Sequence, residues 1–488
     1  MIIEPNTLHY GDCLEIMASF PSEYVDLICL DPPFNSNEKY HTIFKGSGLS
    51  VEPQLKAFDD MWLWDDESAE RVETIKNAIA NPASKVIAGF SQFIPQTPML
   101  SYTSYMAQRL FEMHRILKST GSIYLHCDLT ASHYLKLVMD AIFDVRNFRN
   151  EIVWHYFKPH SSKRAYPNNY NSLLYYVKQN NAEYVFNFDA ILVEYDDKAV
   201  KRYDKVDEQG RRYKIYNNKD GTIRKSYMKT GKPENVFDIP FIQGTAKEKL
   251  GYPTQKPLAL YERIIKASSN RGDLVLDPFC GCGTTIEAAL KNGRNAIGID
   301  ILPFALRLIN RERIIPQGIT ALPVYGVPVD LPTASMLAKT DAFKFQDWAI
   351  SLIDGLASNA QKVGDDGIDG FGILLHKPGN MDRKGIVVQV TGASGSQRAK
   401  FDRLQTTIRN SNAAMGILIT LEAQSARYKW RHTLDPIIMG ESRYEPIQCF
   451  SVEEYFEIGG KVESLLNLPP LANPWTGKEI QRTLFDKS

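Results

Sequence analysis

The chain has little cysteine and no long apolar segment, and these shortages exclude several classes of protein. Its 488 residues include 6 cysteines, none in a CxxC pair, and the 9 histidines show no zinc-type spacing. We therefore expect reduced thiols. No stretch reaches the roughly 18 uncharged apolar residues of a membrane span, and the opening MIIEPNTLHYGD lacks the features of an export signal. A cytoplasmic protein without a membrane partner is expected.

An excess of charge is also missing, because 57 Lys and Arg balance 57 Asp and Glu. Zero net charge argues against a surface that attracts polyanions everywhere, although a local basic patch is still allowed. The sequence has one between His155 and Lys232, where 16 Lys and Arg outnumber 9 Asp and Glu and 11 tyrosines lie among them.

A chain of this length exceeds one compact core, so two or three domains are expected. Apolar strands alternate with amphipathic helices over residues 25–143 and 257–313, which predicts an α/β domain with a mainly parallel sheet. The pattern loses its regularity between 154 and 251, and we expect an inserted region there. The predicted domains are 1–315 and a smaller α/β domain over 341–488, joined by a proline-bearing linker over 316–340.

One motif is VDLICLDPPF, a buried strand that ends in Asp31, Pro32, Pro33 and Phe34. The Asp31 carboxylate and the Pro32 carbonyl are hydrogen-bond acceptors, and prolines add no competing N–H. Phe34 offers an aromatic face on which a base can stack. Taken alone, this segment could equally be a turn that ends a strand.

A second motif, VLDPFCGCGTT, reads as a strand, a glycine turn and a helix N-terminus. Gly281 and Gly283 allow the backbone to approach a ligand, and the helix presents free N–H groups to it. Asp300 ends the next strand, where an acid can accept hydrogen bonds from ribose hydroxyls. The segment lacks both GxGxxG and GxxxxGK[ST], and a purely structural turn is the alternative.

Together, LDPPF and DPFCGCGTT resemble the amino-methyltransferases that act on DNA with S-adenosyl-L-methionine. Their order resembles the beta group, as do GYPTQKPLALYERIIKASSNRGD and HYGDCLEIMASFP, and the resemblance covers residues 1 to about 313. It implies a Rossmann-like, S-adenosyl-L-methionine-dependent methyltransferase fold with permuted motif order. The implied partner is double-stranded DNA, from which the target base is flipped.

The resemblance assigns roles to individual residues. The catalytic segment is Asp31, Pro32, Pro33 and Phe34, although Tyr is commoner than Phe in the last position. Asp at the first position favours the N6 amine of adenine over the N4 amine of cytosine, which is the alternative target. The implied cofactor-binding residues are Asp12, Lys256, Asp277, Phe279, Gly281, Gly283, Thr284 and Asp300.

The irregular region is the natural place for target recognition, since its cations can neutralise phosphates and read base edges. A solvated, tyrosine-rich insertion is the alternative. The candidate DNA-binding residues are Lys158, Lys163, Arg164, Arg211 and Arg212.

The C-terminal segments DDGIDGFGILL and KGIVVQVTGASG resemble the Mrr-like branch of the PD-(D/E)xK nuclease fold. Asp369 and Gln389 match its metal-site positions, but Thr391 stands where a lysine is expected. We therefore predict a domain that does not cut DNA, with no metal beyond these vestigial candidates. An unrelated α/β domain is the alternative.

Three readings of the whole chain remain: a methyltransferase in restriction-modification or phage defence, a fused methyltransferase–endonuclease, and a non-enzymatic DNA-binding subunit. A homodimer and a separate restriction endonuclease are the partners considered.

Overall fold

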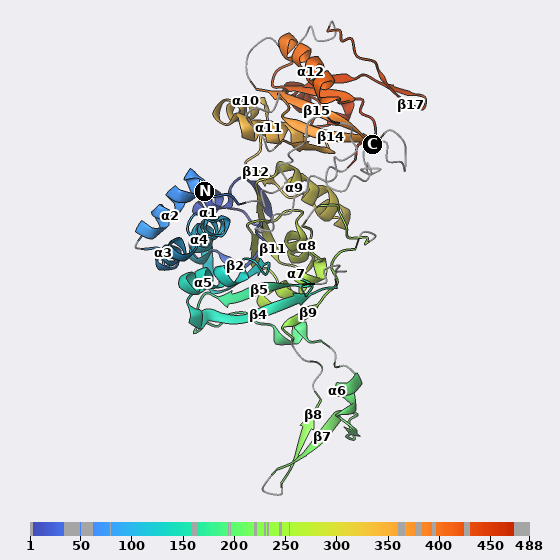
Figure 1. The fold of residues 1–488 in the computed structure, drawn as a ribbon. Helices are drawn as coiled ribbons and strands as arrows, with labels where there is room; N and C mark the ends of the chain where they lie inside the picture. Colours follow the sequence, from blue (N-terminus) through green and yellow to red (C-terminus); the bar gives the residue numbers. More distant parts are fainter. Residues whose placement is uncertain are drawn as a thin grey trace.

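The computed structural model describes residues 3–33, 49, 62–78, 80–157, 164, 166–193, 195, 197–218, 222–228, 231, 234–243, 246–252, 254–359, 367–375, 383–392, 397–423 and 430–472. It shows a large α/β body, a smaller α/β unit beside it and an arm that projects from the body's far end (Figure 1).

A nine-stranded sheet forms the body. Its strand order is β12-β1-β11-β10-β2-β3-β5-β4-β9, and all pairs are parallel except those of β5 with β3 and β4. The strands are β1 (Thr7–Tyr10), β2 (Val25–Leu30), β3 (Leu117–Cys127), β4 (Phe148–His155), β5 (Tyr170–Val177), β9 (Val236–Asp238), β10 (Leu274–Asp277), β11 (Asn295–Asp300) and β12 (Val324–Tyr325). The predicted mainly parallel sheet is confirmed.

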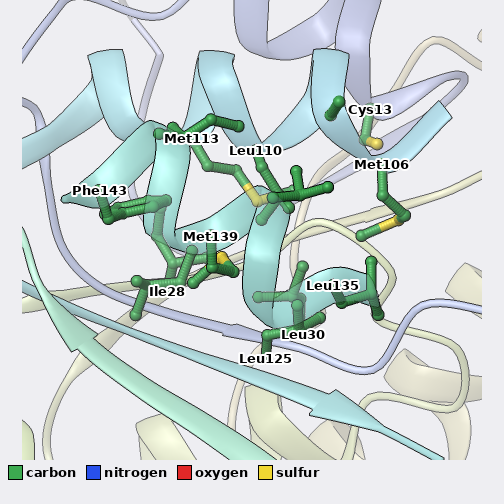
Figure 2. Packing of buried hydrophobic residues seen from close by; sticks show 14 of the residues in the cluster. Cys13, Ile28, Leu30, Met106, Leu110, Met113, Leu125, Leu135, Met139 and Phe143 are labelled. Atoms are coloured by element: carbon green, nitrogen blue, oxygen red, sulfur yellow. The ribbon is translucent and has the colours of Figure 1, made fainter. Parts of the chain in front are cut away.

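Helices cover both faces of this sheet because its central strands are buried on both sides. One face carries α1 (Cys13–Ala18), α2 (Asp66–Asn77), α3 (Ser84–Phe93), α4 (Pro98–Ile116) and α5 (Ser132–Phe143). Figure 2 shows side chains of α4 and α5 packed onto Ile28 and Leu30 of β2. The other face carries α7 (Leu258–Ser268), α8 (Thr284–Lys291) and α9 (Pro303–Leu308), the last continuing into the π-helix η4 (Ile309–Ile314).

The structure corrects two sequence expectations. Strand β5 lies inside the region expected to be an irregular insertion, yet it pairs with β3 and β4 in the main sheet. The expected linker is also structured: β12 pairs with β1, and α10 (Leu331–Thr340) carries a capping box at Asp330. Prolines suggested a linker, but the first turn of a helix accepts proline without losing a hydrogen bond.

The C-terminal unit contains a five-stranded sheet of order β13-β14-β15-β16-β19. Its elements are α11 (Ala342–Ser351), β13 (Leu356–Ser358), β14 (Gly370–Leu375), β15 (Arg383–Thr391), α12 (Gln397–Ser411), β16 (Met415–Thr420), β17 (Ile437–Met439), β18 (Ser442–Tyr444), β19 (Ile447–Ser451) and α13 (Val452–Glu457). Val327 packs against the cores of both units, and Arg311 pairs with Asp354 between them.

The arm is a small three-stranded sheet that follows η3 (Phe188–Ile191). Its strands are β6 (Lys205–Val206), β7 (Arg212–Asn217) and β8 (Ile223–Tyr227), and the short helix α6 (Asp197–Lys201) precedes them. Figure 1 shows it reaching away from the rest of the molecule. Among the described residues, no helix is long and apolar enough to cross a membrane.

Candidate active site

The carboxyl ends of neighbouring parallel strands open into a pocket, as expected for an α/β sheet. Gly11 follows β1, Asp31 follows β2, and Asp277 and Asp300 end β10 and β11. The pocket encloses about 840 Å³, part of it open to solvent. Its lining includes Gly11, Cys13, Asp31, Pro32, Pro33, Tyr105, Tyr252, Lys256, Tyr261, Asp277, Phe279, Gly281, Thr284 and Asp300.

The glycine turn between β10 and α8 requires its glycines. Gly281 and Gly283 have φ of +47° and +77°, a region that favours glycine. A Cβ at Gly283 would lie 2.5 Å from Ile309 Cγ1, and one at Gly281 would lie 3.2 Å from Tyr252 Cε1. The Cys280 N–H donates to the Ile299 carbonyl at 3.0 Å, so the turn is held against β11.

Asp300 holds this turn in place. Its Oδ2 accepts a hydrogen bond from the Gly281 N–H at 2.8 Å, and its Oδ1 accepts one from the Leu302 N–H at 2.8 Å. Burial raises the pKa of Asp300 to about 6. Carboxylate oxygens have lone pairs beyond these two bonds, so a role toward ribose hydroxyls stays a prediction.

Asp277 is the second buried acid of the pocket. It is 3% exposed, and its Oδ1 accepts a hydrogen bond from the Phe279 N–H at 3.1 Å. Burial raises the pKa of Asp277 to about 7, with a smaller contribution from the charges of Asp31 and Asp300. Near neutral pH this carboxyl is therefore partly protonated.

Asp31 forms an ion pair through its Oδ2 with the ammonium of Lys256, which is 8% exposed. Its Oδ1 is buried, lies 3.4 Å from His126 Nδ1, and accepts no hydrogen bond from the residues that the structure describes. Burial raises the pKa of Asp31, and Lys256 opposes that shift. Burial also lowers the pKa of His126 well below its usual range, so this imidazole is neutral.

Asp12 lies between two residues of the pocket lining, Gly11 and Cys13, and is not itself part of that lining. Its Oδ1 accepts from the Leu14 N–H at 2.7 Å and caps α1, and its Oδ2 pairs with Arg109. The Arg109 guanidinium lies 3.2 Å from the centroid of the Tyr105 ring, so this network fixes one wall of the pocket.

Sequence reasoning missed several buried polar residues around the pocket. Arg313, 3% exposed, pairs with Glu287 and donates to the Cys282 carbonyl and to Thr284 Oγ1, so it braces the glycine turn from beneath. Tyr261 has a buried hydroxyl with no hydrogen-bond partner among the described residues. Arg313 could have been noticed in the sequence, because it is a charged residue on an otherwise apolar helix face. His126 could not, because it lies at the end of an apolar strand and resembled a core residue.

Other predicted site residues lie elsewhere. Phe34, Lys158 and Lys163 fall outside the described residues, so the shared cleft of Phe34 and Gly281 stays a prediction. Arg164 is exposed, and Arg211 and Arg212 lie on the arm, away from the pocket lining.

In the C-terminal unit, Asp369 Oδ2 accepts from the Val390 N–H at 2.7 Å, and the buried Gln389 amide donates to Thr407 Oγ1 at 3.3 Å. Lys400 of α12 donates to Thr391 Oγ1. The Lys400 ammonium therefore lies next to the position where the nuclease motif has a lysine and this sequence has Thr391. Burial lowers the pKa of Lys400, and the charge of Asp369 opposes that shift.

The chain is similar to known DNA methyltransferases. A family model described as DNA methylase matches residues 25–311. The DNA adenine methyltransferase YhdJ of Escherichia coli is 32% identical over 299 residues, 61% of this chain and 79% of that protein. The type II methyltransferase M.HpaI of Haemophilus parainfluenzae is 32% identical over 200 residues, 41% of this chain and 55% of that protein.

A solved structure described as a DNA modification methylase of Thermus thermophilus, complexed with S-adenosyl-L-methionine, covers 66% of this chain and 99% of its own, at 18% identity and a TM-score of 0.37. The family match carries the assignment, because it spans more than half of the chain and contains nearly all of the pocket. This chain therefore belongs to the N6/N4 DNA methylases, the family of DNA methyltransferases that use S-adenosyl-L-methionine.

Proposed function

We propose that the protein transfers a methyl group to the exocyclic N6 amine of an adenine flipped out of double-stranded DNA. One observation carries the proposal: the acceptor Oδ1 of Asp31 and the glycine turn at Gly281 lie in the same pocket. An amine held by the first can thus meet a methyl donor held by the second. Transfer to the N4 amine of cytosine is the alternative.

The donor set of the pocket fits S-adenosyl-L-methionine, whose sulfonium and ammonium outweigh its one carboxylate and leave a net positive charge. Among the described lining residues, the three carboxyl groups of Asp31, Asp277 and Asp300 face one cation, Lys256, so a cationic ligand is favoured. The lack of a side chain at Gly281 leaves room for close approach. The residues that would hold the cofactor are Asp277, Phe279, Gly281 and Asp300; when bound, it supplies an activated methyl group.

The chain's own residues prepare the nucleophile. The amine nitrogen of a base is weakly nucleophilic because its lone pair is delocalised into the ring. Asp31 Oδ1 accepts one N–H of this amine and the Pro32 carbonyl accepts the other, which localises the lone pair toward the methyl carbon. The nitrogen–carbon bond forms as the sulfur–carbon bond breaks, which leaves a neutral thioether, and the proton passes from the nitrogen to solvent after positive charge has developed there.

Lys256 and His126 prepare Asp31 for this role. The Lys256 ammonium keeps the buried carboxylate ionised and occupies Oδ2, so that Oδ1 is directed to the amine. Neutral His126 adds no competing charge. Phe34 would stack on the flipped base and offset about 1–3 kcal/mol of the cost of flipping.

A transfer assay with labelled cofactor and DNA tests this function. Asp31→Ala is expected to abolish transfer while cofactor binding, measured by calorimetry, is retained. Asp128→Ala is the matched control, since Asp128 also follows a strand but does not line the pocket. Undiminished transfer by Asp31→Ala would reject the mechanism, and a protein that binds no cofactor would favour a non-enzymatic DNA-binding subunit.

Two observations favour adenine. Position 31 is Asp, and the relative of which 79% is covered by this chain is named a DNA adenine methyltransferase. Nucleoside digestion of the product DNA followed by mass spectrometry separates N6-methyladenine from N4-methylcytosine. Finding only the cytosine product would overturn the proposed target and leave the reaction intact.

We also propose that the catalytic domain has the permuted motif order of the beta group. Strand β2, which leads to Asp31, comes early in the chain, yet it pairs with β10, which leads to the glycine turn some 240 residues later. The proposed role is DNA modification in restriction-modification or phage defence, in the cytoplasm, since one relative is named a type II methyltransferase. A homodimer and a separate endonuclease are the proposed partners, and light scattering of the purified protein tests the first.

The C-terminal unit is proposed to be a PD-(D/E)xK-like domain that contacts DNA or a partner without cutting. In support, β14 is antiparallel to β15, which is parallel to β16. If purified protein with magnesium or manganese nicks unmodified DNA, and Asp369→Ala stops this, the chain is instead a fused methyltransferase–endonuclease.

A further inference from the structure

The arm formed by β6, β7 and β8 has two chemically different faces. In an antiparallel sheet, directly paired residues share a face and successive residues alternate between faces. The register pairs Lys214 with Ser226 and Tyr216 with Arg224, which places these four residues on one face together with Arg212. We name this the basic face: Arg212, Lys214, Tyr216, Arg224 and Ser226.

The opposite face is largely apolar. The same register pairs Tyr213 with Tyr227 and Ile215 with Lys225, and Ile223 joins them. Here Lys225 lies over the Tyr213 ring at 5.0 Å, and the Tyr213 and Tyr227 rings are 5.5 Å apart. Contacts within the arm therefore engage Tyr213 and Lys225, while Ile215 and Ile223 of this face stay exposed.

Arg211 and Arg212 were both predicted to bind DNA, but only one of them is free of an ion pair with the described residues of the arm. Arg211 Nε donates to Asp207 Oδ2 at 2.9 Å, and its guanidinium lies 4.5 Å from the centroid of the Tyr227 ring, so Arg211 stabilises the turn between β6 and β7. Arg212 is exposed, and its side chain forms no ion pair with the described residues. The described residues of β7 and β8 include no Asp or Glu, so the cations of the basic face have no compensating acid on their own strands, and the Lys214 ammonium lies over the Tyr216 ring at 4.7 Å.

We propose that the arm lies against duplex DNA with its basic face, through Arg212, Lys214 and Arg224, toward the phosphates beside the target. This rests on the proposed function and adds an orientation to it. Charge complementarity selects the partner, because an uncompensated row of cations fits a polyanion. Its size is suitable too: a two-stranded ribbon fits the major groove, about 12 Å wide, and β7 extends for about 20 Å.

The arm's position supports this surface. Figure 1 shows it reaching beyond the body, so the body does not cover the basic face. An isolated two-stranded hairpin is only marginally stable in water, and β6 adds just two residues to β7 and β8, so a partner along one face would add stabilising contacts. DNA contacted here lies outside the catalytic pocket and supplies affinity and register without touching the reacting atoms.

Two double variants with the same change of charge test the orientation. The basic-face variant is Lys214→Gln with Arg224→Gln, and the control is Lys205→Gln with Lys225→Gln, since Lys205 pairs with Tyr213 and therefore shares the apolar face. The probe is a fluorescently labelled DNA duplex that the wild-type protein methylates, and its affinity is measured by anisotropy over a series of salt concentrations. Circular dichroism checks that both variants fold.

Each phosphate contact contributes about 0.9 to the slope of log affinity against log salt concentration. The basic-face variant loses two such contacts, so its slope is expected to be smaller than that of wild type by about 1.8. When salt rises from 50 to 200 mM, its loss of affinity is therefore ~10-fold smaller than the loss of wild type. Its KM for DNA is expected to rise while kcat stays unchanged. The control is expected to keep the wild-type slope. Equal loss by both variants, or loss by the control alone, overturns the orientation; wild-type protein that methylates no DNA refutes the proposed function instead.

Discussion

The ion pair between Lys256 and Asp31 gives the sharpest prediction. Lys256→Met removes the ammonium and keeps the aliphatic stem, so the carboxylate of Asp31 remains buried without its partner. Breaking one side of a buried ion pair costs about 3–5 kcal/mol, because a charge is left uncompensated. The buried acid relieves this cost by binding a proton, which abolishes the acceptor that the proposed mechanism needs.

The magnitude follows from that cost. Taking the lower figure, about 3 kcal/mol corresponds to ~100-fold in protonation equilibrium, at about 1.36 kcal/mol for each tenfold step. The burial-raised pKa of Asp31 rises further in the variant, so methyl transfer is expected to fall by up to ~100-fold at neutral pH and to recover as the pH increases. Lys256→Arg keeps the charge and is expected to retain most of the activity.

The measurement is kcat/KM for DNA across a pH series for wild type and both variants, with cofactor affinity determined in parallel. The pH profile separates this role from simple cofactor binding, since a lost cofactor contact would lower the rate equally at every pH. A Lys256→Met profile parallel to that of wild type would refute the reasoning.

Further predictions concern the floor of the pocket. Gly283→Ala is expected to lower Tm more than Gly318→Ala, because both glycines have positive φ but only the first Cβ meets a neighbour, Ile309; equal losses would contradict the steric argument. Arg313→Met is expected to cost about 3 kcal/mol of stability by leaving the partly buried Glu287 without its cation, measured by urea unfolding, and Arg313→Lys should recover part of it. Because burial raises the pKa of Asp277 to about 7, the folded protein holds this proton more tightly than the unfolded chain does. The resulting stabilisation is complete below the ordinary pKa of Asp and is lost as pH rises through 7. Free energies of unfolding should therefore fall from about pH 5 to about pH 8, by less in Asp277→Asn, and an unchanged slope in that variant would show that another group is responsible.

Much of the fold could be predicted from local pattern. The apolar runs before Asp31 and Asp277 give buried parallel strands, and the glycine turn is recognisable because only glycine readily tolerates its φ. The family resemblance read from LDPPF and DPFCGCGTT is confirmed by the family match over residues 25–311.

Other features depend on contacts between distant residues. Strand β5 escapes prediction because its tyrosines and asparagine resemble the polar insertion around it, and only pairing with β3 and β4 makes it a strand. The partner of Asp31 lies 225 residues away in the sequence, so no spacing rule could find it. The same holds for Arg211 and Arg212, whose different roles follow from strand register and from one acid, Asp207.

The pocket's carboxyl groups also link cofactor binding to their own ionisation. Asp277 and Asp300 sit near the edge of ionisation because burial raises their pKa values to about 7 and about 6. A bound cation stabilises their charged forms, which lowers those pKa values, and linkage then requires that the cation bind more tightly as pH rises through this window. Affinity for S-adenosyl-L-methionine should therefore increase between about pH 5 and about pH 8, and the gain should shrink in Asp277→Asn. This rise in affinity with pH is opposite in sign to the fall in stability of the ligand-free protein. The same buried carboxyl groups therefore lower the free energy of unfolding at the pH where the pocket binds the cofactor best.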